Sequence, residues 1–272
     1  MDNKAIRLDA YLVSAGYAGG RDKAKEMIAA GQVLVDGVTV TKASRAVTPA
    51  QTVECRAPRQ KYVGRGGYKL ERAIEAADLD VTDAVAMDVG ASTGGFTDCM
   101  LQCGATHVYA VDVGHDQLHP TLRQDSRVTT LEGTDVRSDR LRETVAAGSV
   151  TFCSVDVSFV SLSNVLPAIL PYLSVDATLV CLIKPQFEAG RAAIGKRGVV
   201  KDRKVHLRVL AEQMTLYASV GLVPTWMGHS PITGGEGNIE YLAVLRRQGT
   251  PVPVDVAHVV DTAFATLKQP AR

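Results

Sequence analysis

The residues of this chain best suited to chemistry are two lysines and two carboxylates that lie far apart in the sequence: Lys69, Asp156, Lys184 and Glu240. A neutral lysine can take a proton from a weak acid such as a hydroxyl, and a protonated lysine can stabilise the alkoxide that forms. Nearby positive charge lowers the pKa of a lysine, whereas nearby carboxylates raise it. The sequence therefore leaves open which of the two roles Lys184 plays.

The elements expected around these residues would bring them to one edge of a sheet. Apolar stretches at residues 150–155 and 179–183 read as buried strands that end at Asp156 and Lys184. Lys69 falls in the first turn of an expected helix. Ligands of open α/β sheets bind beyond the carboxyl ends of the strands, so we expect a cleft at this edge.

A glycine-rich turn links an apolar strand at residues 84–89 to a helical pattern that continues to residue 104. Glycine lets the backbone turn tightly and approach a ligand without a Cβ in the way. The spacing is D-x-G-x-x-x-G-G, with Ser92 in the place of the second glycine of the dinucleotide pattern, and it is typical of enzymes that use S-adenosylmethionine. An ordinary turn without a ligand is the alternative. The expected cofactor contacts in this segment are Asp88, Gly90, Ser92, Gly94, Gly95 and Phe96.

Acidic residues follow the next strands and complete the expected cofactor site. Asp112 follows the strand at 106–111. It lies about 20 residues beyond the glycine turn, where a carboxylate can accept both ribose hydroxyls of an adenosine. Asp135 follows the strand at 127–131 and is expected at the adenine edge, and Asp156 borders the same site. S-adenosylmethionine is therefore the predicted cofactor.

Length and composition indicate an ordinary globular protein with one domain of about 200 residues and a small one. The 272 residues are 46% hydrophobic, yet no apolar run approaches the roughly 18 to 20 residues of a membrane helix. The N-terminus does not read as a leader for export, and the five cysteines form no C-x-x-C pair. We therefore expect reduced thiols and a cytoplasmic location.

His115 and His119 are four residues apart, a spacing that could suit a metal ion on one face of a helix. Pro120 follows directly and no third ligand lies near, so no metal site is expected.

The N-terminal part carries an excess of positive charge. Residues 1–75 hold 13 Lys and Arg against 8 Asp and Glu, which makes nucleic acid the expected partner of this part. Its two short helices and hairpin resemble the S4 RNA-binding domain over residues 5–56; a small protein-binding module with a solvated basic face is the alternative. The resemblance implies phosphate contacts, which supply affinity without reading sequence. The residues implied are Arg7, Arg21, Lys23, Lys25 and Lys42, and the basic linker that follows adds Arg59 and Arg65.

The pattern of elements predicts an α/β fold in three parts: a small S4-like α/β domain at 1–58, a basic linker at 59–67 and a larger domain at 68–272. For the larger domain we expect a seven-stranded, mostly parallel sheet with helices on both faces. The segment 239–245 is expected to form an edge strand. The loop at 186–198, rich in glycine and basic residues, either closes over a bound RNA or is a plain surface loop.

Six features in this order resemble the TlyA family of rRNA methyltransferases, part of the FtsJ-like group, over essentially the whole chain. They are the S4-like domain and the phrases R-G-G-Y-K-L, D-V-G-A-S-T-G-G-F, S-V-D-V-S-F-V-S, I-K-P-Q-F-E and G-N-I-E-Y, which begin at residues 65, 88, 154, 183 and 237. The resemblance implies a class I, Rossmann-like methyltransferase that uses S-adenosylmethionine. It also implies methylation of a ribose 2'-hydroxyl in ribosomal RNA, at cytidine in 16S rRNA, 23S rRNA or both.

The same resemblance implies a K-D-K-E tetrad with a role for each member. Lys184 would be the base, while Asp156 and Lys69 would orient and polarise the reacting groups. Glu240 would align the target ribose, with Glu236 as the alternative for this role.

Other functions fit the sequence less well. Base N-methyltransferases carry N/D-P-P-Y after the fourth strand, where this chain has D-V-S-F; the Phe159 of this phrase either stacks on a base or packs within the protein. A nicotinamide dehydrogenase would need G-x-G-x-x-G. A membrane-lytic haemolysin, suggested only by a name used in the family, would need an amphipathic or spanning segment. A non-catalytic ribosome-assembly factor is consistent with everything except the tetrad.

Overall fold

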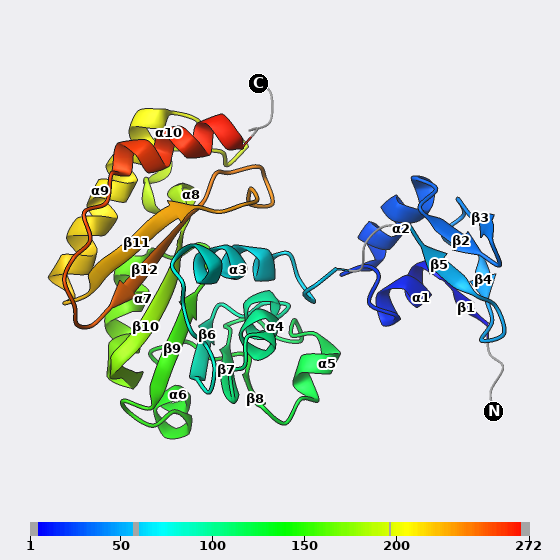
Figure 1. Ribbon diagram of the computed structural model, residues 1–272, viewed down its shortest axis with the longest axis horizontal. Coiled ribbons are helices and arrows are strands. Elements are labelled where there is room, and N and C mark those ends of the chain that lie inside the picture. Colours follow the sequence, from blue (N-terminus) through cyan, green and yellow to red (C-terminus); the bar gives the residue numbers. More distant parts are fainter. Residues whose placement is uncertain (1–4, 57–59, 196, 268–272) are drawn as a thin grey trace. The chain divides into compact units, whose positions relative to one another are not determined.

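The structure is a computed structural model that describes residues 5–56, 60–195 and 197–267. The chain divides into two compact units, Met1–Gly64 and Arg65–Arg272 (Figure 1). This division falls inside the segment 59–67 expected to be a linker, and the domain limits drawn from the sequence stay a prediction.

The N-terminal unit packs two helices, α1 (Leu8–Ser14) and α2 (Arg21–Ala29), on small antiparallel sheets around one apolar core. The hairpin turns at Asp36 and Gly37, whose φ angles of 53° and 77° are those that Asp-Gly turns adopt readily. Its strands are β1 (Ile6–Arg7), β2 (Val33–Val35), β3 (Val38–Thr39), β4 (Ala46–Val47) and β5 (Val53–Cys55). They form a three-stranded sheet of order β3-β2-β5 and a separate pair of β1 with β4.

The larger unit is built on one seven-stranded sheet. Its strands are β6 (Val85–Val89), β7 (His107–Val111), β8 (Val128–Leu131), β9 (Val150–Val155), β10 (Leu173–Ile183), β11 (Val223–His229) and β12 (Tyr241–Arg246). The order is β11-β12-β10-β9-β6-β7-β8, and only the pairings made by β12 are antiparallel. The prediction of a mostly parallel α/β sheet is confirmed.

The prediction of an edge strand at 239–245 is wrong. β12 lies inside the sheet, hydrogen-bonded to β10 on one side and to β11 on the other, and β11 is the edge. The residues of β12 from Tyr241 to Leu245 are all buried. A continuous apolar run of this kind is the pattern of a strand covered on both faces, and the last strand in the sequence need not be the last in space.

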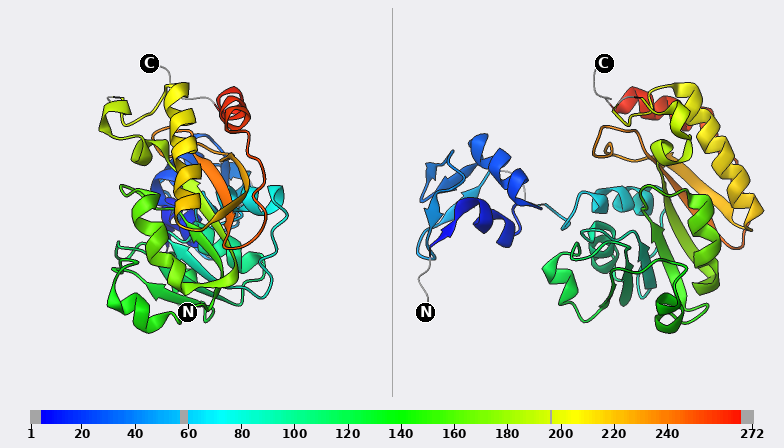
Figure 2. Two further views of the ribbon diagram at one scale, coloured as in Figure 1. Left: turned by 90° about the vertical axis from the view of Figure 1, so that its left-hand side faces the viewer. Right: turned by 180° about the vertical axis from the view of Figure 1, so that it is seen from behind.

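Helices cover both faces of the sheet, and within the described ranges none is long and apolar enough to cross a bilayer. Near β11, α9 and α10 pack together (Figure 1 and Figure 2). The helices are α3 (Gly66–Ala76), α4 (Gly95–Gln102), α5 (Pro120–Arg123), α6 (Asp139–Thr144), α7 (Leu162–Ile169), α8 (Pro185–Glu188), α9 (Arg203–Ser219) and α10 (Val256–Thr266).

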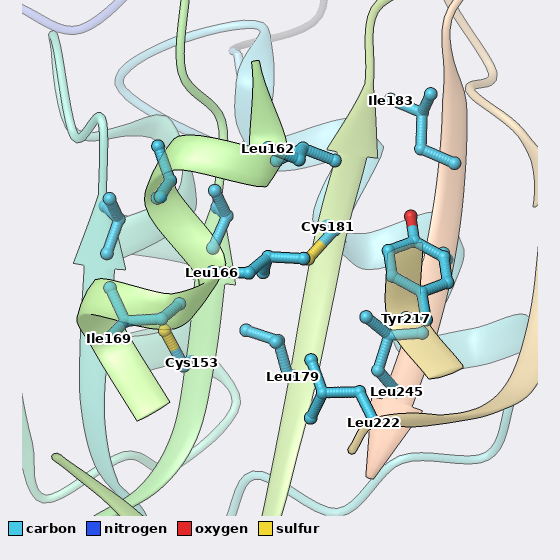
Figure 3. Close-up of a cluster of buried hydrophobic side chains, with 14 of the residues drawn as sticks. Cys153, Leu162, Leu166, Ile169, Leu179, Cys181, Ile183, Tyr217, Leu222 and Leu245 are labelled. Carbon is cyan, nitrogen blue, oxygen red and sulfur yellow. The ribbon is translucent and has the colours of Figure 1, made fainter. Parts of the chain in front are cut away.

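The central strand β10 shows how both faces are filled. Alternate residues of a strand point to opposite faces. Cys181 and Ile183 join the core cluster that also contains residues of α7 and α9, while Val180 and Leu182 are equally buried on the other face. Figure 3 shows this cluster, with Leu166 of α7 directed toward β10. The carboxyl end of β10 is thereby held firmly where it meets the site.

The cysteines are all free thiols. Burial raises the pKa of Cys153 and Cys181, which lie in the cluster of Figure 3. Because the thiolate is the reactive form of cysteine, these two residues serve packing and are chemically inert.

Candidate active site

Four charged side chains meet at the carboxyl edge of the sheet as two ion pairs. Lys184, directly after β10, places Nζ 2.5 Å from Oδ1 of Asp156, which directly follows the neighbouring parallel strand β9. Lys69, in the first turn of α3, places Nζ 2.5 Å from Oε2 of Glu240. Glu240 reaches this edge because it precedes β12, whose direction is opposite to that of the other strands. The structure thus brings all four predicted residues together.

Both ion pairs are largely shielded from water. The side chains of Lys69 and Glu240 are 10% and 3% exposed, and those of Lys184 and Asp156 are 11% and 19% exposed. A buried charge depends strongly on its partner, because removal of one member leaves the other uncompensated in a medium of low polarity. Glu236, the alternative to Glu240, is exposed.

Three further residues contact the pairs and were missed in the sequence. Lys184 Nζ donates to Ser158 Oγ at 3.0 Å and lies 5.8 Å from the ring centroid of Phe187. Gln186 Nε2 donates to Glu240 Oε1 at 3.2 Å, while its Oε1 has no hydrogen-bond partner among the described residues. Each lies within three positions of Asp156 or Lys184. Their closeness in the sequence to a predicted strand end is the feature from which their place in the site could have been predicted.

Three cavities adjoin the two ion pairs. The first, of about 470 Å³, is lined by the glycine turn and by Asp112, Asp135 and Asp156. The second, of about 210 Å³, runs along the same turn to Lys69. The third, of about 730 Å³, is lined by Lys69, Lys184 and Glu240. Because Asp156 lines the first two and Lys69 the last two, the ion pairs sit at the junction of a two-part trough and a wider pocket.

Only some of the cofactor contacts expected in the glycine turn line these cavities. Gly90, Ser92, Gly95 and Phe96 line the cavities. At Gly90, φ is +86° and an added Cβ would overlap the carbonyl oxygen of Asp156, so only glycine fits. A Cβ at Gly94 would instead overlap leucine side chains within the protein, so Gly94 serves the turn itself.

Asp112 presents a carboxylate to the first cavity. Its Oδ2 accepts from the backbone N–H of Ser92 at 2.8 Å and its Oδ1 from that of Gly114 at 2.7 Å. A carboxylate oxygen has two lone pairs, so each oxygen retains one for a ligand hydroxyl. Asp135 lines the same cavity and is held by Arg137, whose bidentate contact lowers its pKa to about 2.

Asp88 lies behind the cavity. It is fully buried, and its carboxylate accepts from Thr97 Oγ1 at 2.7 Å and Ser154 Oγ at 2.9 Å. Burial raises its pKa to about 6, although the two hydroxyls oppose this shift. The contacts join β6 to α4 and β9, so Asp88 is placed to support the turn from within the protein.

Asp88 predicts a pH-dependent stability for the larger unit. Its pKa of about 6 in the folded chain exceeds its ordinary value of 3.8, so the free energy of unfolding should fall as pH rises from about 4 to about 6 and then level off. Asp88→Asn should remove this fall. The measurement is urea unfolding followed by fluorescence of Trp226, the only tryptophan of the chain, which lies in β11. A difference between wild type and variant that stays constant from pH 4 to pH 7 would contradict it.

The predicted RNA contacts separate into distinct groups. Arg7 and Arg21 both donate to Asp9, at 2.8 Å and 3.3 Å, and Asp9 is fully buried with its pKa lowered by these contacts. The two arginines therefore also hold the N-terminal unit together. Lys23 and Lys25 each form an ion pair with a neighbouring acidic residue on α2. Lys42 is exposed, and Arg65 lines the 210 Å³ cavity. Arg59 lies outside the described residues.

The two histidines considered as metal ligands have other surroundings. His119 Nδ1 bonds to Thr121 Oγ1 at 2.7 Å, and His115 lies against Gly133. In the part of the chain that the structure covers, no three His, Cys, Asp or Glu residues gather as a metal site requires.

Comparison with known proteins finds a separate family match for each of the two units. The FtsJ-like methyltransferase description matches residues 62–247, and the S4 domain matches residues 6–53. The chain belongs to the FtsJ-like methyltransferase family. This FtsJ-like methyltransferase is 41% identical to YqxC of Bacillus subtilis, named as a candidate rRNA methyltransferase, over 99% of this chain and 98% of the relative. These matches confirm the predicted family and the S4 domain.

Two further relatives extend the comparison of this FtsJ-like methyltransferase. TlyA of Mycobacterium tuberculosis, named a 16S/23S rRNA (cytidine-2'-O)-methyltransferase, is 42% identical over 90% of this chain and 91% of its own. The solved structure of a candidate hemolysin from Streptococcus thermophilus has a TM-score of 0.74 and 38% identity, with 97% of each chain covered.

Proposed function

We propose that this protein transfers a methyl group from S-adenosylmethionine to the 2'-hydroxyl of a ribose in ribosomal RNA, at a cytidine of 16S or 23S rRNA. The observation that carries the proposal is the pair of buried ion pairs, Lys184–Asp156 and Lys69–Glu240, at the junction of a two-part trough and a wider pocket. The name of the M. tuberculosis relative supports the substrate class. An rRNA substrate implies that the protein works in the cytoplasm.

The two smaller cavities fit the parts of the proposed methyl donor. Asp112 offers two lone pairs in the 470 Å³ cavity, where they would hold the ribose hydroxyls, and Asp135 lies on the same wall for the adenine. Glycine at position 90 lets the turn pack directly against the backbone of Asp156, which also lines the trough. The 210 Å³ cavity is bordered by the cations Arg65 and Lys69 and by the carboxylate of Asp156, so it offers partners of both signs for the amino-acid end of the donor. The donor supplies an electrophilic methyl group.

The chain's own residues would position and activate the hydroxyl in the 730 Å³ pocket. Lys184 would first release its ammonium proton to solvent, and the neutral Nζ would then accept the hydroxyl proton, with Asp156 and Ser158 holding the amine in place. Glu240, held by Lys69 and Gln186, would align the ribose. Because reacting atoms must be brought close and in line, this fixed arrangement would lower the barrier.

The wider pocket also offers a surface for a base. Phe159 is 92% exposed, has a φ of 64°, and lies 4.9 Å from Phe187 between ring centroids. Aromatic rings at the mouth of an RNA pocket are suited to stacking on an unpaired base. We propose that Phe159 does so, and that the loop at 186–198, which also lines this pocket, covers the RNA.

The deciding experiment is transfer of tritiated methyl from S-adenosylmethionine to purified ribosomal subunits, followed by mapping of the modified ribose. Label on a cytidine 2'-oxygen supports the proposal. Label on a base would exclude ribose as the target. Binding of subunits without any transfer, under conditions where donor binding is demonstrated, would favour the non-catalytic assembly factor.

Asp112→Ala should weaken donor binding by roughly tenfold to a hundredfold, because a hydrogen-bonded, desolvated hydroxyl pair loses its acceptor, at about 1.5 to 3 kcal/mol. Titration calorimetry with S-adenosylmethionine measures this. Asp116→Ala is the control, since Asp116 is an exposed carboxylate on the same loop that pairs with Arg123. Equal donor affinity in Asp112→Ala and wild type would exclude the placement.

Replacement of Lys23, Lys25 and Lys42 by alanine should weaken RNA binding and flatten its salt dependence by up to roughly 2.1 to 2.7 units of slope, at roughly 0.7 to 0.9 per lost phosphate contact. These lysines are preferable to Arg7 and Arg21, whose loss would leave Asp9 buried without a partner. Binding to rRNA fragments across a salt series gives the slope, and donor affinity is the control. An unchanged slope would mean that the N-terminal unit has another partner.

A further inference from the structure

Glu188 joins the two loops that carry the Lys184–Asp156 ion pair, although it lines none of the three cavities. Its Oε2 accepts from Ser161 Oγ at 2.7 Å and its Oε1 from the backbone N–H of Leu162 at 2.9 Å. Ser161 caps α7 and ends the loop that begins at Asp156. Glu188 is the last residue of α8, which begins immediately after Lys184. One side chain thus spans both strand-end loops.

The helix α8 needs such a contact because it is very short. It contains four residues, and a helix of this length has no stability of its own in water. Its carboxyl end is also held by Arg208, whose Nη2 donates to the carbonyl of Ala189 at 3.0 Å. Arg208 ties α8 to α9, whereas Glu188 ties it to α7. Of these two contacts, the one made by Glu188 acts across the gap between the β9 and β10 loops that the ion pair must bridge.

The chemistry of the contact suits a rigid link. A carboxylate at a helix N-terminus meets unpaired N–H groups and the positive end of the helix dipole, which favours it. Hydrogen bonds to an ionised group are shorter and stronger than neutral ones. The two loops also meet where they begin, directly after β9 and β10. There, Lys184 Nζ lies 2.5 Å from Asp156 Oδ1 and 3.0 Å from Ser158 Oγ.

We infer that Glu188 is a positioning residue, which sets the placement of Lys184 relative to Asp156 and Ser158 for methyl transfer. The inference rests on the proposed function of that site. Removal of the link leaves the walls of the donor trough in place, because Glu188 is not among the residues that line it. It loosens α8 against α7, and the reacting groups then occupy their working arrangement for a smaller fraction of the time.

The test compares Glu188→Ala and Glu188→Gln in the full chain, with Asp255→Ala as a matched control. Asp255 also accepts a helix N-terminal N–H, from His258 at 2.9 Å, but it caps the remote α10. We expect Glu188→Ala to lower kcat by about tenfold to thirtyfold with donor Kd within twofold of wild type, since small misplacements of reacting groups are costly. Glu188→Gln keeps a carbonyl for Leu162 and an amide for Ser161, and should retain kcat within about threefold.

Amide hydrogen exchange supplies a readout that does not depend on activity. Glu188→Ala should speed exchange at residues 162–163 and 187–189, while Asp255→Ala should leave these segments unchanged and lower thermal stability to a similar degree. A kcat for Glu188→Ala equal to that of wild type overturns the inference, as does an equal loss of kcat in Asp255→Ala. Failure of the proposed function is distinguishable, because wild type itself would then transfer no methyl while the exchange result still reports on the link.

Discussion

Replacement of Lys184 by alanine is expected to lower kcat by roughly 10²- to 10⁴-fold, the usual span for a lost acid or base, while donor and RNA affinity stay close to wild type. The side chain lies at the carboxyl end of β10, with Nζ held by Asp156 and Ser158 beside the pocket proposed for the ribose. Single-turnover methyl transfer at saturating donor and RNA measures the loss. The residual activity should also lack the pH dependence of the wild-type rate, provided that chemistry limits it.

Lys184→Arg distinguishes a base from a positional charge. A guanidinium keeps its proton at any working pH and is broad and planar, so the variant should stay as slow as Lys184→Ala. An arginine variant that methylates ribose at nearly the wild-type rate would remove the base assignment. The proton acceptor would then be sought in a water held by Asp156.

Gly90→Ala is the second substitution with a large expected effect, because it disturbs both the trough proposed for the donor and the Lys184–Asp156 ion pair. The new Cβ would overlap the backbone carbonyl of Asp156, and Asp156 N–H already bonds to the carbonyl of Val89 at 2.8 Å. The ends of β6 and β9 must therefore separate, which widens the trough and displaces Asp156 from Lys184. We expect donor affinity to fall by at least about a hundredfold, or roughly 2.7 kcal/mol, together with a loss of kcat.

Gly221→Ala is the matched control for that substitution. Gly221 has a φ of +71°, similar to the +86° of Gly90, but an added Cβ there meets open space. The control thus carries the backbone strain of alanine in this region, about 1 kcal/mol, without the overlap. Calorimetry should show normal donor binding in Gly221→Ala and binding weaker by at least about a hundredfold in Gly90→Ala. Comparable binding in the two variants would show that the turn tolerates a side chain.

The features that the sequence predicts well are those set by local pattern. A buried strand followed by a polar residue places that residue at the sheet edge, and this rule alone is sufficient for Asp112, Asp156 and Lys184. The position of β12 was not predictable in the same way, because neither its apolar run nor its spacing shows which neighbours it pairs with. The order of strands is decided by packing across the whole sheet.

The side-chain roles that were missed depend on long-range contacts. Arg7 and Arg21 look like surface cations in the sequence, yet both donate hydrogen bonds to the buried Asp9. Asp9 precedes Arg21 by 12 residues, so the sequence does not show this contact. Asp88 belongs to the glycine-turn motif, but the alternation of a strand sends its side chain to Thr97 and Ser154 inside the protein. A motif gives the residue type and the position along the chain; the direction of the side chain follows from the assembled fold.

The interior position of β12 also has a consequence for how the chain is made. Synthesis runs from the N-terminus, so β10 emerges from the ribosome well before the strand that covers its free edge. Until residues 241–246 are available, that edge presents unpaired N–H and C=O groups beside apolar side chains, an arrangement prone to pairing with other chains. β11 is in the same state, because among the described strands it pairs with β12 alone. A chain released early, before Glu240 and β12 have been added, would lack the residue proposed to align the ribose and would also be exposed to aggregation, because the segment that completes the proposed site also covers the open strand edges.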